Sequence, residues 1–136
     1  MARKAPLHDS DYAALADFRA ALRGFMAFSE EKAGEVGLTP QQHQALLAIR
    51  GAAAGQATIG YVAERLILKP HSASELADRL EAQGLIKRRA AKADRRKTFL
   101  VLTARASALL AALSATHREE IRRLKPLLID LLDRFG

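Results

Sequence analysis

Prolines and glycines divide this chain into segments, and their positions limit what it can fold into. Gly34 and Gly37 close a long amphipathic stretch, while Gly51, Pro70 and Gly84 interrupt the sequence that follows. Glycine favours the positive φ angles at which helices end, and proline lacks the backbone N–H that a continuing helix needs. We therefore expect short elements in the middle of the chain, with long helices only on either side of them.

Helical periodicity and capping signals place the elements between these breaks. Thr39, Pro40 and Gln42 combine an N-cap, a first-turn proline and a capping box, which together make an unusually clear helix start. Bulky and β-branched residues over 98–103 predict a strand, which a basic loop joins to a strand beginning at Leu85. Helices are expected at residues 11–33, 40–51, 59–66, 71–83 and 104–124, and Pro126 restarts or kinks the last one into a segment at 127–135.

The composition indicates one folded domain and excludes several kinds of chemistry. With 136 residues, of which 49% are apolar, the chain is long enough for one hydrophobic core. Cysteine is absent, so disulfides, thiolate nucleophiles and cysteine-based zinc sites are excluded. The histidines lack metal-binding spacing, and neither a glycine-rich phosphate loop nor a nucleophile elbow occurs. We therefore expect neither an enzyme nor a bound metal or cofactor.

The sequence gives no sign of membrane insertion. It contains no run of about eighteen apolar residues, and residues 1–10 are too polar for the apolar part of a signal peptide. We therefore expect a cytoplasmic protein.

Positive charge is concentrated in one short segment. From Lys87 to Lys97 there are seven basic residues and one acidic residue, Asp94, whereas the net charge of the whole chain is only +7. A near-neutral body with one basic segment indicates a polyanionic partner, either nucleic acid or an anionic membrane surface, although a solvated run of charges has the same composition. Aromatic residues are too few for a platform that stacks single-stranded bases, which favours duplex DNA.

The order of the expected elements is that of a mainly α winged helix-turn-helix. Two short helices separated by a brief turn precede a two-stranded hairpin, the wing, and long helices stand at both ends. In this fold the second short helix enters the major groove of DNA. We expect a single domain over residues 1–136, with the DNA-binding lobe at 38–103.

The last segment of the chain predicts a dimer. Its apolar residues form an arc too wide to lie exposed on a monomer of this size, and a second copy of the chain covers it most simply. Two-fold symmetry then matches palindromic DNA. We therefore assign residues 9–36 and 104–136 as dimerisation helices. The apolar arc consists of Leu124, Leu127, Leu128, Leu131, Leu132 and Phe135.

Three stretches resemble the motifs of one known family, in the same order. Residues 38–49 (LTPQQHQALLAI) are similar to L-T-x-x-Q-x-x-x-L, and residues 72–89 (SASELADRLEAQGLIKRR) to S-x-x-T-x-L-V-D-R-L-E-x-x-G-L-V-x-R. Residues 93–103 (ADRRKTFLVLT) are similar to a D-x-R wing motif ending in L-T. With these motifs the chain resembles the MarR-type transcriptional regulators. It departs from their pattern at Ala106, where glycine is usual, and at Glu75, where arginine or a neutral polar residue is usual.

The resemblance implies a function as well as a fold. It implies a homodimer that binds double-stranded DNA at a pseudo-palindromic operator, acts as a repressor and is released by a small aromatic effector. It also implies that Arg96 lies at the wing tip and reaches into the minor groove. The family's alternative release mechanism, oxidation of a cysteine, is excluded here because the chain has none.

Several residues of the lobe are candidate DNA contacts, each with a simpler alternative. Ser72 reaches phosphates or base edges, or else caps its helix with Glu75 in an S-x-x-E box. Arg79 contacts the DNA backbone or pairs with Glu75, and Asp94 shapes the wing by pairing with Arg88 or Arg96. Only one of the adjacent Arg88 and Arg89 is expected to face DNA, because strand residues alternate. The predicted DNA-binding residues are Arg65, Lys69, His71, Ser72, Ser74, Arg79, Arg88, Arg95, Arg96 and Lys97.

A second set of residues is a candidate ligand cleft. Its members are apolar or aromatic except for one histidine, and their helical spacing fits core or dimer-interface positions equally well. The set comprises Phe18, Phe25, Met26, His43 and Leu47.

Two other functions compete with sequence-specific regulation. One is an architectural protein that binds DNA with little sequence preference. The other is a winged-helix protein-interaction module whose basic hairpin contacts an acidic protein or lipid.

Overall fold

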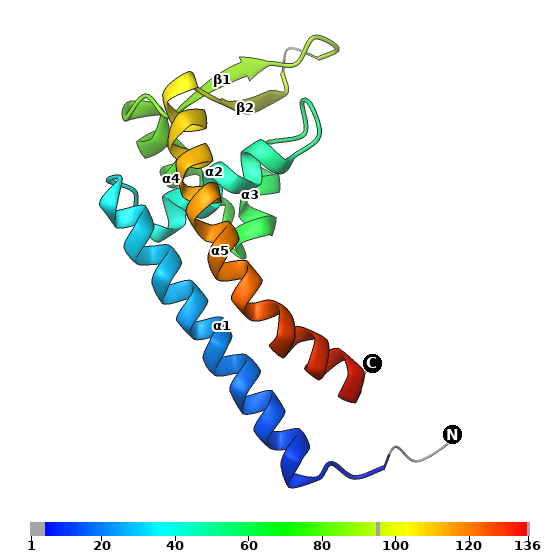
Figure 1. Ribbon diagram of the computed structural model, residues 1–136. Coiled ribbons are helices and arrows are strands. Elements are labelled where there is room, and N and C mark those ends of the chain that lie inside the picture. Colours follow the sequence, from blue (N-terminus) through cyan, green and yellow to red (C-terminus); the bar gives the residue numbers. More distant parts are fainter. Residues whose placement is uncertain (1–4, 95, 136) are drawn as a thin grey trace. The chain divides into compact units, whose positions relative to one another are not determined.

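The computed structural model describes residues 5–94 and 96–135 of the chain, and Figure 1 shows its elements. The described chain is mainly helical, with one two-stranded antiparallel sheet, and this confirms the predicted winged helix-turn-helix fold. None of the described helices is long and apolar enough to cross a membrane. The elements are α1 (Asp9–Glu35), α2 (Pro40–Gly51), α3 (Ile59–Leu66), α4 (Pro70–Ala82), β1 (Ile86–Ala90), β2 (Thr98–Leu102) and α5 (Ala104–Phe135).

The chain forms two compact units, which we describe separately. The first, called the lobe below, comprises residues 32–114. The second, called the terminal-helix unit, combines residues 1–31 with residues 115–136. The division falls inside helices, because the last turn of α1 and the first turns of α5 belong to the lobe.

Local capping sets where the helices of the lobe begin. The Thr39 hydroxyl accepts a hydrogen bond from the Gln42 N–H, and the Gln42 side chain accepts one from the Thr39 N–H, both at 3.1 Å. This is the capping box predicted for α2. Thr58 caps α3 in a similar way, accepting from the Tyr61 N–H at 3.1 Å. These caps fix the starts of the two helices that precede α4.

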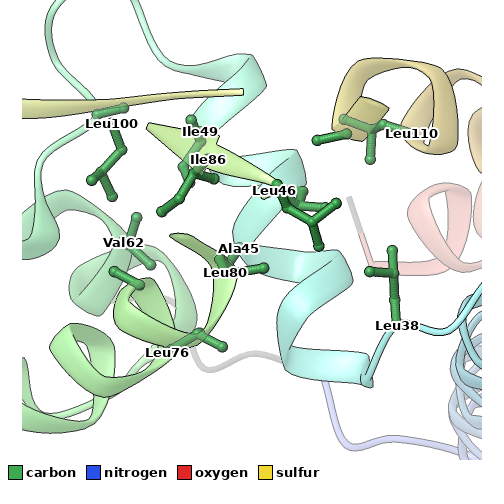
Figure 2. Packing of buried hydrophobic residues seen from close by; sticks show 14 of the residues in the cluster. Leu38, Ala45, Leu46, Ile49, Val62, Leu76, Leu80, Ile86, Leu100 and Leu110 are labelled. Atoms are coloured by element: carbon green, nitrogen blue, oxygen red, sulfur yellow. The ribbon is translucent and has the colours of Figure 1, made fainter. Parts of the chain in front are cut away.

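The lobe has one continuous apolar core, to which each of its helices and both strands contribute buried residues (Figure 2). Leu46 of α2, Leu80 of α4 and Ile86 of β1 are almost completely buried, as is Leu85 between α4 and β1. Burial of a side chain of this size stabilises a fold by about 2 kcal/mol. Ala106 of α5 is also fully buried, so the departure from glycine noted at this position is accommodated by a small side chain.

The first strand of the wing includes Arg88 and Arg89, as their expected alternation requires. Ile86 pairs with Leu102 and Ala90 pairs with Thr98, so residues 87–89 are strand residues. The apolar partners across the hairpin supply the packing that basic residues alone lack. Leu100 also donates its N–H to the Ala57 carbonyl at 2.8 Å, which ties β2 to the segment before α3.

Helix α5 does not restart at Pro126, which corrects one of the two expected effects of this proline. The helix runs without interruption from Ala104 to Phe135, with the proline inside it. A proline removes one hydrogen bond to the carbonyl four residues earlier, here that of Arg122. Because Arg122 is exposed, water can bond this carbonyl and the helix continues.

The terminal-helix unit pairs the first part of α1 with the last part of α5 in antiparallel order. Ser29 lies beside His117, with 2.8 Å between Oγ and Nε2, and Asp11 lies beside Arg134 at 3.5 Å. The carboxylate of Asp130 and, less strongly, that of Asp11 raise the pKa of Arg134. Within the described part of this unit, the buried residues are Ser29 and His117, and no apolar side chain is fully buried.

Candidate nucleic-acid interface

Helix α4 presents a polar face because its apolar face is buried in the lobe. Ala73, Leu76, Ala77 and Leu80 are buried at helical spacing and hold one side of the helix against the core. The opposite side is free for contact with a partner, since its residues are exposed or partly exposed. These residues are His71, Ser72, Ser74, Glu75, Asp78 and Arg79.

The start of α4 excludes the capping box that the sequence suggested for Ser72 and Glu75. The helix begins at Pro70 with Lys69 as its N-cap, so Ser72 lies inside the first turn instead of at the cap. Glu75 instead contacts His71, with 3.1 Å between Oε1 and Nε2. The Glu75 carboxylate therefore pairs with His71, one turn earlier in the helix, and it does not form the alternative pair with Arg79.

Arg65 and Lys69 flank the turn between α3 and α4, and both are exposed. Arg65 lies in the last turn of α3, with its guanidinium carbon 6.0 Å from the centre of the Tyr61 ring. Lys69 is the N-cap of α4 with an extended backbone, and its exposed ammonium group is accessible to an anion. The turn between α3 and α4 therefore has an exposed cation on each side.

Asp94 organises the end of the wing through Arg96. Its Oδ1 accepts a hydrogen bond from the Arg96 N–H at 3.0 Å and lies 3.8 Å from the Arg96 Nε. The Arg96 side chain is 96% exposed, so this contact orients the loop without enclosing the guanidinium. Lys97 is exposed nearby, and its N–H donates to the Asp94 carbonyl at 3.0 Å. Arg95, another predicted contact, lies outside the described residues.

Arg88 has intramolecular partners that sequence reasoning missed. Its guanidinium contacts Asp78 and lies 3.6 Å from Glu81, both on α4. Two carboxylates compensate this arginine, so it joins β1 to α4 and contributes little positive charge to the surface. Arg89 is exposed on the other face of the strand, as the alternation of strand residues requires. The spacing of Asp78 and Glu81, three residues apart on one helix face, was the available signal.

The predicted cleft residues are divided between the two units, so the cleft stays a prediction. Phe18, Phe25 and Met26 belong to the terminal-helix unit, whereas His43 is buried in the lobe and Leu47 is 39% exposed there. Sequence reasoning missed two further polar residues of the terminal-helix unit, Ser29 and His117. The His117 ring meets the Phe25 and Phe28 rings edge-on at 5.8 and 5.6 Å.

The lobe contains two hollows that relate to these assignments. One of about 400 Å³ lies between the end of α2, the following loop and β2, and is lined mainly by small apolar residues. None of the predicted cleft residues lines it. A second hollow, of about 170 Å³, is lined by Leu47 together with Arg65. The described residues contain no group of three side chains suited to hold a metal ion.

Comparison with known proteins relates the middle of the chain to one family. A model of the MarR family matches residues 36–97, which contain α2, α3, α4 and β1 and end just before β2. Over these residues the chain is similar to the MarR family of transcriptional regulators. No curated protein matches it.

Several solved structures share the fold of this chain. MepR, described as a transcription regulator of the Staphylococcus aureus multidrug efflux pump MepA, has a TM-score of 0.73 at 20% identity, covering 88% of this chain and 96% of its own. The S. aureus MepR–DNA complex has a TM-score of 0.67 at 21% identity, with 89% and 85% covered. AbsC, a MarR-family regulator from Streptomyces coelicolor, has a TM-score of 0.68 at 22% identity, with 94% and 84% covered.

Proposed function

We propose that this protein is a MarR-type homodimeric repressor that binds a pseudo-palindromic operator in double-stranded DNA. The observation that carries the proposal is the exposed polar face of α4, in the same compact lobe as a wing with uncompensated positive charge. An α-helix fits the major groove of B-DNA, and cationic side chains on either side of it neutralise phosphates. The S. aureus MepR structure solved with DNA supports this assignment by its similar fold.

The charges of the lobe suit α4 and the wing to different kinds of contact with DNA. On α4, Glu75 and Asp78 offset the basic residues, so the helix is suited to polar contacts with base edges. The wing instead exposes cations with Asp94 as its single acidic residue, which suits it to phosphates and to the negative potential of a narrow minor groove. We assign the exposed wing contacts to Lys87, Arg89, Lys92, Arg96 and Lys97.

Dimerisation follows from the apolar surface of the terminal-helix unit. Many of its large apolar side chains are exposed in the single chain, and they lie along both α1 and α5. A second copy of the chain covers them symmetrically, with 9–36 and 104–136 as dimerisation helices and 38–103 as the DNA-binding lobe. The exposed residues are Leu7, Tyr12, Leu22, Met26, Ile121, Leu127, Leu128, Ile129, Leu132 and Phe135.

We also propose that a small aromatic compound releases the repressor from DNA. The predicted cleft set supplies apolar and aromatic surface and one buried imidazole, which are the groups that such a compound needs. The residues proposed to line the cleft are Phe18, Phe25, Met26, His43 and Leu47.

Selection of duplexes from a random pool at physiological salt tests the proposal. We expect an enriched pseudo-palindrome that binds at least about a thousandfold tighter than random duplex. Equal affinity for both contradicts it and indicates an architectural protein. The variant Arg96→Ala should weaken duplex binding without changing dimerisation. If it leaves duplex binding intact, the wing is a protein-interaction surface instead.

A further inference from the structure

Ile67 has an unusual backbone and an unusual exposure. It follows the last residue of α3, with φ 54° and ψ 51°, in the left-handed region. Among the described residues, it alone adopts a positive φ without being glycine. Its side chain is 93% exposed, by far the highest value for a large apolar residue in the described chain. A β-branched residue in this conformation is a genuine outlier.

The neighbouring residues explain how the conformation is held but not why isoleucine occupies it. The Leu68 N–H donates to the Ala63 carbonyl at 2.8 Å, and the Ile67 N–H donates to the Glu64 carbonyl at 3.3 Å. This pattern ends a helix with a left-handed residue, for which glycine is preferred. Leu66 and Leu68 pack against the core on either side and turn the Ile67 side chain outward. Isoleucine therefore adds strain and exposed apolar surface without any packing in the lobe.

The chemistry around Ile67 points to one kind of partner. Arg65 and Lys69, two residues away on either side, are both exposed, and Lys69 is the N-cap of α4. An apolar side chain between two cations fits a surface on which anions alternate with apolar carbon. Duplex DNA has this pattern, since phosphates flank the deoxyribose carbons and thymine methyl groups line the major groove.

We propose that Ile67 makes an apolar contact with the carbon surface of duplex DNA at the edge of each half-site, against a thymine methyl group or a deoxyribose. The inference rests on the proposed DNA-binding function and adds a residue to it. The turn between α3 and α4 then contributes more than phosphate contacts. It places a rigid aliphatic group beside the first turn of the recognition helix.

The variant Ile67→Gly separates this role from a structural one. Glycine relieves the backbone strain, so the thermal midpoint should be equal to or above that of the wild type. Affinity for the selected operator should nevertheless fall about fifteenfold, because a dimer presents the side chain twice and burial of one methyl or methylene group on each side is worth about fourfold. Ile67→Leu, which keeps an apolar side chain, should restore most of the affinity.

Salt dependence distinguishes this contact from the ionic ones beside it. Ile67→Gly removes no charge, so the slope of log affinity against log salt should be unchanged. Lys69→Gln is the matched control, and each phosphate contact it loses should reduce the slope by about 0.9. A changed slope for Ile67→Gly, or a lower thermal midpoint, overturns the proposal.

Operators in which single thymines are replaced by deoxyuridine identify the contacted carbon. If the wild type loses about fourfold at one position of each half-site while Ile67→Gly loses nothing there, the partner is the thymine methyl. If no position responds but Ile67→Gly still binds less tightly, the partner is the deoxyribose. Equal operator affinity of Ile67→Gly and wild type overturns the inference alone, whereas a wild type that selects no duplex overturns the proposed function as well.

Discussion

The lobe and the terminal-helix unit differ in where their apolar side chains lie. Every fully buried apolar residue in the described chain belongs to the lobe, whereas most of its exposed large apolar residues belong to the terminal-helix unit. The lobe therefore has a core of its own, while the other unit has an apolar surface that still needs a cover. One chain therefore combines a lobe that has its own core with helices whose exposed apolar residues support the proposed dimer.

The largest expected effect is on the core of the lobe. Leu46 and Leu47 are neighbours on α2, with 0% and 39% of their surfaces exposed. We expect Leu46→Ala to lower the free energy of unfolding by about 3 kcal/mol, because it leaves a cavity in a closely packed core. Leu47→Ala is the matched control and should change it by less than about 1 kcal/mol. Chemical denaturation measures both, and equal losses would contradict the assignment of Leu46, and not Leu47, to the core of the lobe.

The next prediction concerns the apolar surface of the terminal-helix unit. Leu132 is 57% exposed in the single chain, and we expect it to be buried by the second copy. Leu132→Asp should weaken dimerisation by on the order of a hundredfold, because it places an unpaired carboxylate in an apolar interface. The exposed Lys125→Asp on the same helix is the control and should leave the dimer intact. Analytical ultracentrifugation compares the two, and an undisturbed Leu132→Asp dimer would mean that this surface is not the interface.

A smaller effect is expected at the tip of the wing. Arg96→Ala should reduce operator affinity by roughly tenfold and lower the salt slope by about 2, since each dimer has two wings. Arg19→Ala removes the same charge from the terminal-helix unit and should leave the slope unchanged. Titrations at several salt concentrations provide the test. If the slope changes with Arg19→Ala and not with Arg96→Ala, the terminal-helix unit contacts the DNA and the lobe does not.

The smallest effect is expected where the wing is joined to α4. Asp78→Asn weakens one of the two carboxylate contacts of Arg88, and the pair is partly exposed. We expect a loss of about 0.5 kcal/mol in the free energy of unfolding, which is typical of an exposed ion pair. Operator affinity should change by less than about threefold, because Arg88 remains held by Glu81. A large loss of affinity with unchanged stability would instead indicate that Asp78 itself contacts DNA.

Local signals predicted the helices of the lobe well. The Thr39 cap, the stop at Gly84 and the proline that begins α4 act within a few residues, so their effects can be derived from sequence. Of the two expected effects of Pro126, the restart was wrong, because a proline disrupts only one exposed turn of a helix that is otherwise continuous.

Contacts between distant segments were harder to predict. Arg88 and Arg89 were expected on a strand, but the register of residues 87–89 with β2 depends on partners across the hairpin and has no signal of its own in the sequence. The contacts of Arg88 with α4 depend on how the wing folds back onto that helix. The left-handed Ile67 has no sequence signal, because glycine is the residue that normally marks such a position.

The mass of the complex between this protein and its selected operator tests the central claim most directly. Light scattering on purified chain and duplex gives the number of chains per duplex. We predict a dimer in the absence of DNA and two chains on each pseudo-palindromic duplex, with one lobe for each half-site. A monomer that binds one half-site as tightly as the full operator would contradict the account.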